Sequence, residues 1–434
     1  MNPLRILVLA PGSNPDSIST ALVGYAHSEA LARLHAVIVV VNERHEAAIR
    51  RKSAAFRGIE AVSTPWLDYL FDWLIQRIFK GDYGSQVLTA LGYPFLLVFE
   101  WKAWQRLRRR IKAGEFDVVL RLLPVVPTLP SMFPFLLRRL PIPFVIGPLN
   151  GGLPWPEGFT QAAKQKEWIA CLRSLYRFMP FSRSTYRRAS AIITGSSQTY
   201  SEFASHREKL FFVPENGLSR VLLDSATPRG QRNGKLELIY VGRLVPYKAP
   251  DIAVRAAAGL VRQGLSTLTI VGDGPERAGL GQLADTLGIA KGVSFVGWLD
   301  HGETLQTIQK ADVLIFPSIR EFGGGVVFEA LALGVVPVVV DYGGPGDIVT
   351  AKVGYKVALT NEQDMIAQIE KILISLEGNR SLLAQLQEQG MIYARENLSW
   401  DGKALAVTQI LNWATGRGPK PELMPPKVLS SVYS

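Results

Sequence analysis

Residues 236–248 read LELIYVGRLVPYK and residues 313–329 read VLIFPSIREFGGGVVFE, and these two stretches decide the fold. Each begins with a short apolar run that lacks strict polar alternation, which is typical of parallel strands covered on both faces. Each run is followed by a loop that carries charged residues, and the second loop carries three glycines as well. Open α/β sheets bind their ligands beyond the carboxyl ends of the strands. The two stretches therefore predict a doubly wound α/β domain with a ligand site on these loops.

The charged residues of the two loops suit a sugar nucleotide. Arg243 offers a bidentate guanidinium and Lys248 an ammonium, the two groups that best bind a diphosphate. Glu321 and Glu329 offer carboxylate acceptors for sugar and ribose hydroxyls. A helix start is predicted at Gly325, so Glu329 would lie inside the helix while Glu321 stays on the preceding loop. A Glu pair at this spacing also arises by chance, and a lone Arg or Lys is usually a solvated surface residue. It is the order and spacing of all four that favour a site.

Strand and helix patterns alternate in two series along the 434 residues, which predicts two Rossmann-like domains. A turn-prone break at Pro214, Asn216 and Gly217 separates the series. Trp400–Trp413 is predicted to be a helix, and the proline-rich tail 415–434 to be disordered or loosely docked. The predicted strands of the two series are Leu4–Ala10, Ala36–Val41, Asp117–Leu120, Phe144–Ile146, Ala191–Thr194 and Leu210–Val213, then Leu236–Val241, Leu268–Val271, Val293–Val296, Val313–Phe316 and Val335–Val340.

The net positive charge of the chain comes entirely from its first half. Through Glu215 there are 27 Lys and Arg against 16 Asp and Glu, whereas the remainder carries 21 of each. This asymmetry favours an anionic partner, either a membrane surface or a phosphate-bearing acceptor. No recognition motif for nucleic acid accompanies it. Cys171 is the single cysteine, which excludes an intramolecular disulfide and fits a reducing cytosol.

Two segments concentrate the basic residues, Trp101–Lys112 and Lys164–Arg188. In the first, Trp101, Trp104, Leu107 and Ile111 form one helix face, which could lie in a membrane interface. The alternative is that this face packs into the domain core while the arginines are solvated. The single cysteine favours a cytoplasmic protein, and the first alternative places it at the inner face of the cytoplasmic membrane.

The motifs from Tyr240 to Gly344 resemble those of retaining glycosyltransferases of the GT-B fold, in the "group 1", glycosyltransferase family 4-like family. The resemblance implies two Rossmann-like domains facing across a cleft: residues 1–215 on the acceptor side and 216–396 for the nucleotide sugar. It also implies a C-terminal helix, 397–414, that crosses back to the first domain, and a tail, 415–434. The transferred sugar would come from a nucleotide-diphosphate sugar and go to a glycan or lipid-linked acceptor.

The resemblance also implies the site residues. Arg243, Lys248 and Glu321 would be catalytic, and Glu329 would hold the ribose. FVGWL resembles the base-binding loop. The further donor-binding residues implied are Gly12, Gly297, Trp298, Leu299, Gly323, Gly324, Gly325 and Val326. The loop GPLNGG resembles an acceptor-side loop through Asn150, Gly151 and Gly152.

Two departures from the family pattern stand out. Only Gly12 matches the usual glycine pair of the first loop, in PGSNPDS. The family commonly has a histidine near DVVLRLLP, but this chain has Leu120 and Leu122 there, so Arg121 is the nearby polar group that could take over the sugar contact. The alternative to an enzyme is therefore a catalytically silent sugar-nucleotide-binding partner subunit.

The chemistry implied is transfer with retention, in which Arg243 and Lys248 stabilise the charge of the departing diphosphate. No D-x-D pair occurs and the five histidines lack metal-ligand spacing, so neither a metal nor another cofactor is expected. VGDGPER has Arg277 in place of the third glycine of a dinucleotide fingerprint, and GSSQT lacks the closing glycine of a nucleophile elbow. Both a dehydrogenase and a serine hydrolase are disfavoured.

Overall fold

A computed structural model describes residues 2–17, 19–66, 92–151, 179–226 and 234–426, together with residues 69, 70, 73 and 77. The chain forms two compact units. Unit 1 consists of Met1–Gly152, Lys166–Glu215 and Lys403–Ser434, and unit 2 of Leu153–Gln165 and Asn216–Gly402. The chain passes from unit 1 to unit 2 between Glu215 and Asn216, and it returns within the last helix.

Unit 1 contains a parallel sheet of seven strands in the order β3-β2-β1-β4-β5-β6-β7. Its order reverses between β1 and β4, the topological switch point of a doubly wound sheet. The strands are β1 (Arg5–Leu9), β2 (Ala36–Asn42), β3 (Gly58–Val62), β4 (Val118–Arg121), β5 (Phe144–Leu149), β6 (Ala191–Thr194) and β7 (Leu210–Phe212). The named helices of this part are α1 (Thr20–Ala32), α2 (Glu43–Lys52), α5 (Tyr93–Lys112), α6 (Phe133–Leu136), α9 (Ser182–Arg188), α10 (Ser197–Glu202) and η2 (Ala204–Lys209).

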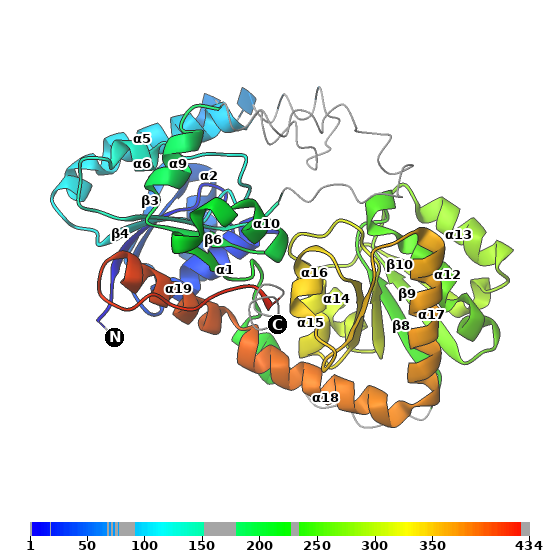
Figure 1. Cartoon of the computed structure of the whole chain (residues 1–434). Coiled ribbons are helices and arrows are strands. Elements are labelled where there is room, and N and C mark those ends of the chain that lie inside the picture. The colour runs from blue at the N-terminus through cyan, green and yellow to red at the C-terminus, as the bar shows by residue number, and fades with distance from the viewer. Residues whose placement is uncertain are drawn as a thin grey trace. The chain divides into compact units, whose positions relative to one another are not determined.

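Unit 2 repeats this architecture with six parallel strands in the order β10-β9-β8-β11-β12-β13, so its switch point lies between β8 and β11 (Figure 1). The strands are β8 (Leu236–Val241), β9 (Ser266–Val271), β10 (Val293–Gly297), β11 (Val313–Phe316), β12 (Val336–Val340) and β13 (Tyr355–Val357). The helices are α11 (Arg220–Ser225), η3 (Pro246–Lys248), α12 (Pro250–Arg262), α13 (Arg277–Thr286), η4 (Ala290–Gly292), α14 (His301–Ile308), α15 (Gly325–Ala332), α16 (Gly343–Ile348), α17 (Glu362–Gly378), α18 (Arg380–Asn397) and α19 (Trp400–Ala414), which continues into unit 1.

Both faces of the unit 2 sheet are covered, as the unbroken apolar runs predict. Along β11, Val313 and Ile315 pack into one buried cluster with residues of α12 and α17. Leu314 and Phe316 pack into another with residues of α15 and α18. Period-two alternation therefore separates two cores rather than a core from water.

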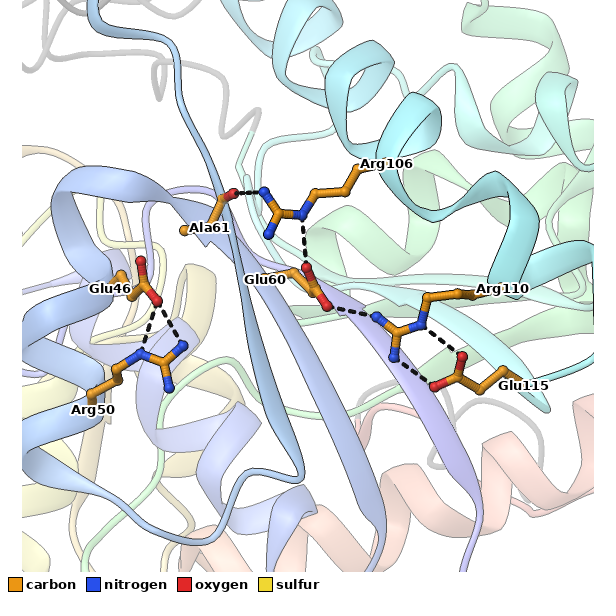
Figure 2. A network of polar contacts seen from close by, with 7 residues as sticks. All are labelled: Glu46, Arg50, Glu60, Ala61, Arg106, Arg110 and Glu115. Atoms are coloured by element: carbon orange, nitrogen blue, oxygen red, sulfur yellow. Dashed lines mark hydrogen bonds and ion pairs between the residues drawn. The ribbon is translucent and has the colours of Figure 1, made fainter.

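The basic helix α5 packs most of its apolar face into the core of unit 1, as the second of the two alternatives predicts. Trp104, Leu107 and Ile111 are buried in the core, and only Trp101 of the four is exposed. Arg106 and Arg110 both bind Glu60 on β3, and Arg110 also binds Glu115 through two hydrogen bonds (Figure 2). These ion pairs fix α5 against the sheet edge. Of Lys164–Arg188, residues 164–178 lie outside the described residues.

Residues 415–426 of the tail dock on other parts of unit 1, which is the second of the two alternatives given for the tail. Arg417 forms an ion pair with Asp117 at 2.7 Å, and the amide of Phe212 donates to the carbonyl of Leu423 at 2.8 Å. Phe212 belongs to β7, the edge strand, whose outward amides need partners. The tail supplies one. Composition alone did not decide between disorder and docking, because a proline-rich segment can also cover a sheet edge as an extended chain.

Candidate functional site

The loops after β8 and β11 bring the predicted cations and the first predicted carboxylate to one edge of unit 2. The two strands pair directly, Val313 opposite Leu238, and both run in the same direction. Arg243 and Lys248 follow β8, and Glu321 follows β11. These residues therefore lie beyond the carboxyl ends of the strands at the switch point, where such sheets bind ligands.

Lys248 and Glu321 form an ion pair at this edge. Each side chain is only 15% exposed, so the pair is much less screened than a surface pair. The second oxygen of Glu321 accepts from the amide of Gly324 at 3.1 Å. The ammonium of Lys248 also lies 5.4 Å from the ring centroid of Phe316. Both charged groups are thus held in place by further contacts, which pre-organises them for a ligand.

Two tyrosines that the sequence reasoning missed organise the loop after β8. Arg243 donates a hydrogen bond to the hydroxyl of Tyr247. The buried hydroxyl of Tyr240 lies 3.3 Å from the carbonyl oxygen of Arg243 and 3.4 Å from that of Lys248, so it can donate to either end of the loop. Burial raises the pKa of Tyr240 and the charge of Glu321 raises it further, so the phenol remains a neutral donor. The only sign of this role in the sequence is a tyrosine, Tyr240, as the residue before the last of β8.

Glu329 lies on α15, in its second turn, and pairs with a histidine. The prediction of a helix start at Gly325 is confirmed. The imidazole Nε2 of His301 lies 2.8 Å from Oε1 of Glu329. Their hydrogen bond raises the pKa of His301, while burial opposes it. The sequence reasoning set His301 aside because it tested histidines only for metal spacing.

The glycines between the two acids shape the start of α15. Gly324 has φ 63°, and a Cβ there would stand 2.8 Å from Cγ of Pro345. This left-handed conformation and close approach favour glycine over other residues. Gly323 precedes it, and Gly325 is the first helical residue. Val326 packs partly buried against the core beneath.

The predicted base-binding loop begins at the last residue of β10, which is an edge strand of the same sheet. Gly297 has φ 75° with open space beside its Cα. Trp298 is well exposed, whereas Leu299 packs against the core. An exposed indole is available for stacking on a base. The hydrogen bonds and ring contacts described for Lys248 and Glu321 do not include residues 297–299.

The acceptor-side prediction falls on unit 1, where Asn150 belongs to a buried polar network. Its Nδ2 donates to Glu215 at 2.8 Å, and its Oδ1 accepts from Ser196 at 3.0 Å and from the amide of Gly151 at 3.1 Å. Lys403 of α19 donates to the carbonyl of Pro214 at 2.8 Å. Burial lowers the pKa of Lys403 to about 7 although the charge of Glu215 opposes the shift. Gly12 follows β1 on the loop 11–12, and Gly152 lies outside the described residues.

Arg121 is fully buried, so its guanidinium is not available to a sugar. Two of its nitrogens donate to backbone carbonyls, Nη1 to Leu129 at 2.6 Å and Nη2 to Pro124 at 3.0 Å. The carboxylate of Glu100, also buried, supplies its countercharge. These contacts indicate a structural role, contrary to the expectation that Arg121 replaces the family's histidine.

The described ranges contain no cluster of three or more His, Cys, Asp and Glu that could hold a metal ion. In the same ranges, every helix is too short or too polar to cross a bilayer.

Known proteins are similar to this chain in sequence and in fold. The family model of glycosyl transferases group 1 matches residues 226–390. D-inositol 3-phosphate glycosyltransferase of Rhodococcus erythropolis is 30% identical over 200 residues, 43% of this chain and 44% of that protein. Glycogen synthase of Mycobacterium tuberculosis is 28% identical over 225 residues, 49% of this chain and 52% of that protein. The chain spans about half the length of these curated relatives.

Solved structures resemble the chain over nearly its whole length. HepE of Anabaena in complex with UDP gives a TM-score of 0.62 at 16% identity, covering 94% of this chain and all 100% of that chain. Sucrose-phosphate synthase from Thermosynechococcus elongatus gives 0.63 at 17% identity, covering 95% and 99%. Such low identities show the fold alone, which is GT-B. The chain thus has the GT-B fold, and its residues 226–390 match the model of the glycosyl transferases group 1 family.

Proposed function

We propose that this chain is a retaining, metal-independent glycosyltransferase that moves a sugar from a nucleotide-diphosphate sugar to a hydroxyl of a glycolipid, polysaccharide or other glycoconjugate. One observation carries the proposal: the pair of Lys248 and Glu321, largely shielded from water, at the switch point of unit 2. A cation and an acid held there suit a diphosphate and a sugar hydroxyl respectively.

The ion pair gives the site a simple binding chemistry. A diphosphate oxygen attracts Lys248 and Arg243, and a sugar hydroxyl donates to Glu321. Binding therefore exchanges one ion pair for contacts with the ligand, and it leaves neither buried charge without a partner. As the bond to the diphosphate breaks, the two cations stabilise the charge that develops on the leaving group. The leaving phosphate can accept the proton of the acceptor hydroxyl, so this scheme assigns no protein nucleophile.

The first prediction concerns the donor. HepE was solved with UDP and with UDP-glucose, which makes a UDP-linked sugar the first candidate for this chain. In a thermal-shift screen of UDP-, GDP- and ADP-sugars, we expect one base to stabilise the protein. A ligand at one hundred times its dissociation constant adds about 2.7 kcal/mol. No response to any of them would contradict the proposal.

A catalytically silent binding subunit is the alternative function, motivated by the absent histidine at Leu120 and Leu122. Donor hydrolysis or transfer that disappears in Glu321→Ala excludes it. Tight donor binding without turnover, across a broad panel of acceptors, would support it instead.

We also propose that unit 1 docks on an anionic membrane surface at the cytoplasmic face. Trp66, Tyr69 and Trp73, large aromatic side chains of unit 1, are 62%, 75% and 47% exposed. Trp101, on α5, is exposed as well. Aromatic side chains of this kind lie at membrane interfaces, and the basic excess of the first 215 residues complements anionic headgroups.

The second prediction tests this docking. Co-sedimentation should be stronger with phosphatidylglycerol vesicles than with phosphatidylcholine vesicles, and the double variant Trp66→Ser/Trp73→Ser should bind several-fold less because aromatic area is lost. Ile374→Ser, at an exposed apolar position of unit 2, is the control and should bind like the wild type. Equal binding to both vesicle types, or no effect of the double variant, would refute membrane docking.

A further inference from the structure

His301 has a fixed position at the start of α14. Asp300 caps this helix: its carboxylate accepts from the amide of Glu303 at 2.7 Å, and the Glu303 carboxylate accepts from the amide of Asp300 at 3.1 Å. Such a reciprocal capping box fixes the backbone on both sides of His301. The imidazole is therefore presented from a rigid helix end rather than from a mobile loop.

From this position His301 reaches across to Glu329 on α15. The imidazole is 61% exposed, whereas the carboxylate side chain is 20% exposed, so the histidine lies on the solvent side of the acid. It contacts only Oε1 of Glu329 at 2.8 Å. An ionised carboxylate offers about four acceptor positions. One bond therefore fixes the rotamer of Glu329 and leaves acceptor capacity for hydroxyl groups.

We propose that His301 is a positioning residue that orients Glu329 toward the two ribose hydroxyls of the nucleotide. The inference rests on the proposed function, in which Glu329 holds the ribose. A free glutamate side chain loses rotamer entropy when it binds a ligand, and a neighbour that fixes it beforehand removes part of this cost. His301 thus contributes to nucleotide affinity without touching the nucleotide. Its contribution requires a ribose.

The third prediction follows from this requirement. His301→Ala should weaken binding of the nucleoside diphosphate, in UDP, GDP or ADP form, about three- to tenfold, because the bond to Glu329 is charge-assisted but partly exposed. His301→Gln keeps a donor that can reach Glu329 and should restore most of the affinity. Neither variant should change binding of the 2′,3′-dideoxy analogue or of inorganic pyrophosphate. Isothermal titration calorimetry measures all three ligands.

Two controls separate positioning from a general effect on the fold. His206→Ala, a histidine of unit 1, should bind the nucleotide like the wild type. In a Glu329→Gln background, His301→Ala should add little further loss, because the acid that it orients is already impaired. Unchanged nucleotide affinity in His301→Ala overturns the inference, and so does equal weakening of all three ligands. If the wild type binds none of the three nucleoside diphosphates, the proposed function itself fails, and the inference with it.

Discussion

Lys248→Met is expected to slow sugar transfer by about tenfold to a hundredfold or more, since a charge-assisted hydrogen bond contributes roughly 1.5 to 3 kcal/mol. The loss should appear in kcat as well as in kcat/KM, because the ammonium acts most strongly on charge that develops as the diphosphate departs. The methionine fills a similar volume, so packing against Phe316 is largely kept.

The partner acid Glu321 allows a control for this fourth prediction, the effect of Lys248→Met on transfer. Lys248→Met leaves Glu321 without its cation, so part of the effect could come from an uncompensated carboxylate. The double variant Lys248→Met/Glu321→Gln removes that charge and should recover stability without recovering transfer. Lys352→Met, at an exposed position of unit 2, is the matched control and should behave like the wild type. Full activity in Lys248→Met would contradict its role at the diphosphate.

The fifth prediction is that Arg121→Met destabilises the protein by several kcal/mol, about 1 to 3 kcal/mol for each of two buried carbonyls that lose their donor. The substitution leaves the carbonyls of Leu129 and Pro124 without their donor and Glu100 without its countercharge. Urea unfolding measures the loss. The exposed Arg108→Met on α5 should change stability by less than about 0.5 kcal/mol.

The pH dependence of Arg121→Met gives an independent check. Burial raises the pKa of Glu100 to about 7, and Arg121 holds it from rising further. A carboxyl with a raised folded pKa binds its proton more tightly when folded, so stability falls as pH rises from about 4.5 to about 7. Without Arg121 the pKa rises again, and the decline should extend above pH 7. Adding Glu100→Gln should abolish that extension.

Arg121→Met also decides between two roles of this residue. A structural arginine predicts that the folded fraction of the variant still binds the donor. If Arg121 instead contacts the sugar in place of the family's histidine, transfer would be lost while stability stayed unchanged. That result would overturn the structural role.

The sequence predicted the fold and the strand-end location of the donor loops because both follow from short-range patterns. Apolar runs without alternation indicated covered parallel strands, and the glycines before Glu329 indicated a helix start. It missed β3, whose five residues GIEAV include a glycine and a glutamate, and β13, which has three residues. Elements this short carry too little pattern to stand out.

The errors at individual residues arise from tertiary contacts. Arg121 is the last residue of a strand, a common place for a ligand-binding residue. It is buried instead, where it is attracted by the buried Glu100, 21 positions earlier on α5. The apolar face of α5 is compatible with a membrane face and with a core face, because a lipid bilayer and a protein core are both apolar surroundings. His301 and Glu329 are 28 positions apart, and only the packing of α14 on α15 brings them together.

The most direct test of the central claim is a crystal structure of the protein with the nucleotide sugar that responds in the thermal-shift screen. We expect diphosphate oxygens within hydrogen-bonding distance of Arg243 and Lys248, about 3 Å, with the sugar at Glu321 and the ribose at Glu329. A nucleotide sugar bound elsewhere, with these four side chains out of its reach, would contradict the proposed function.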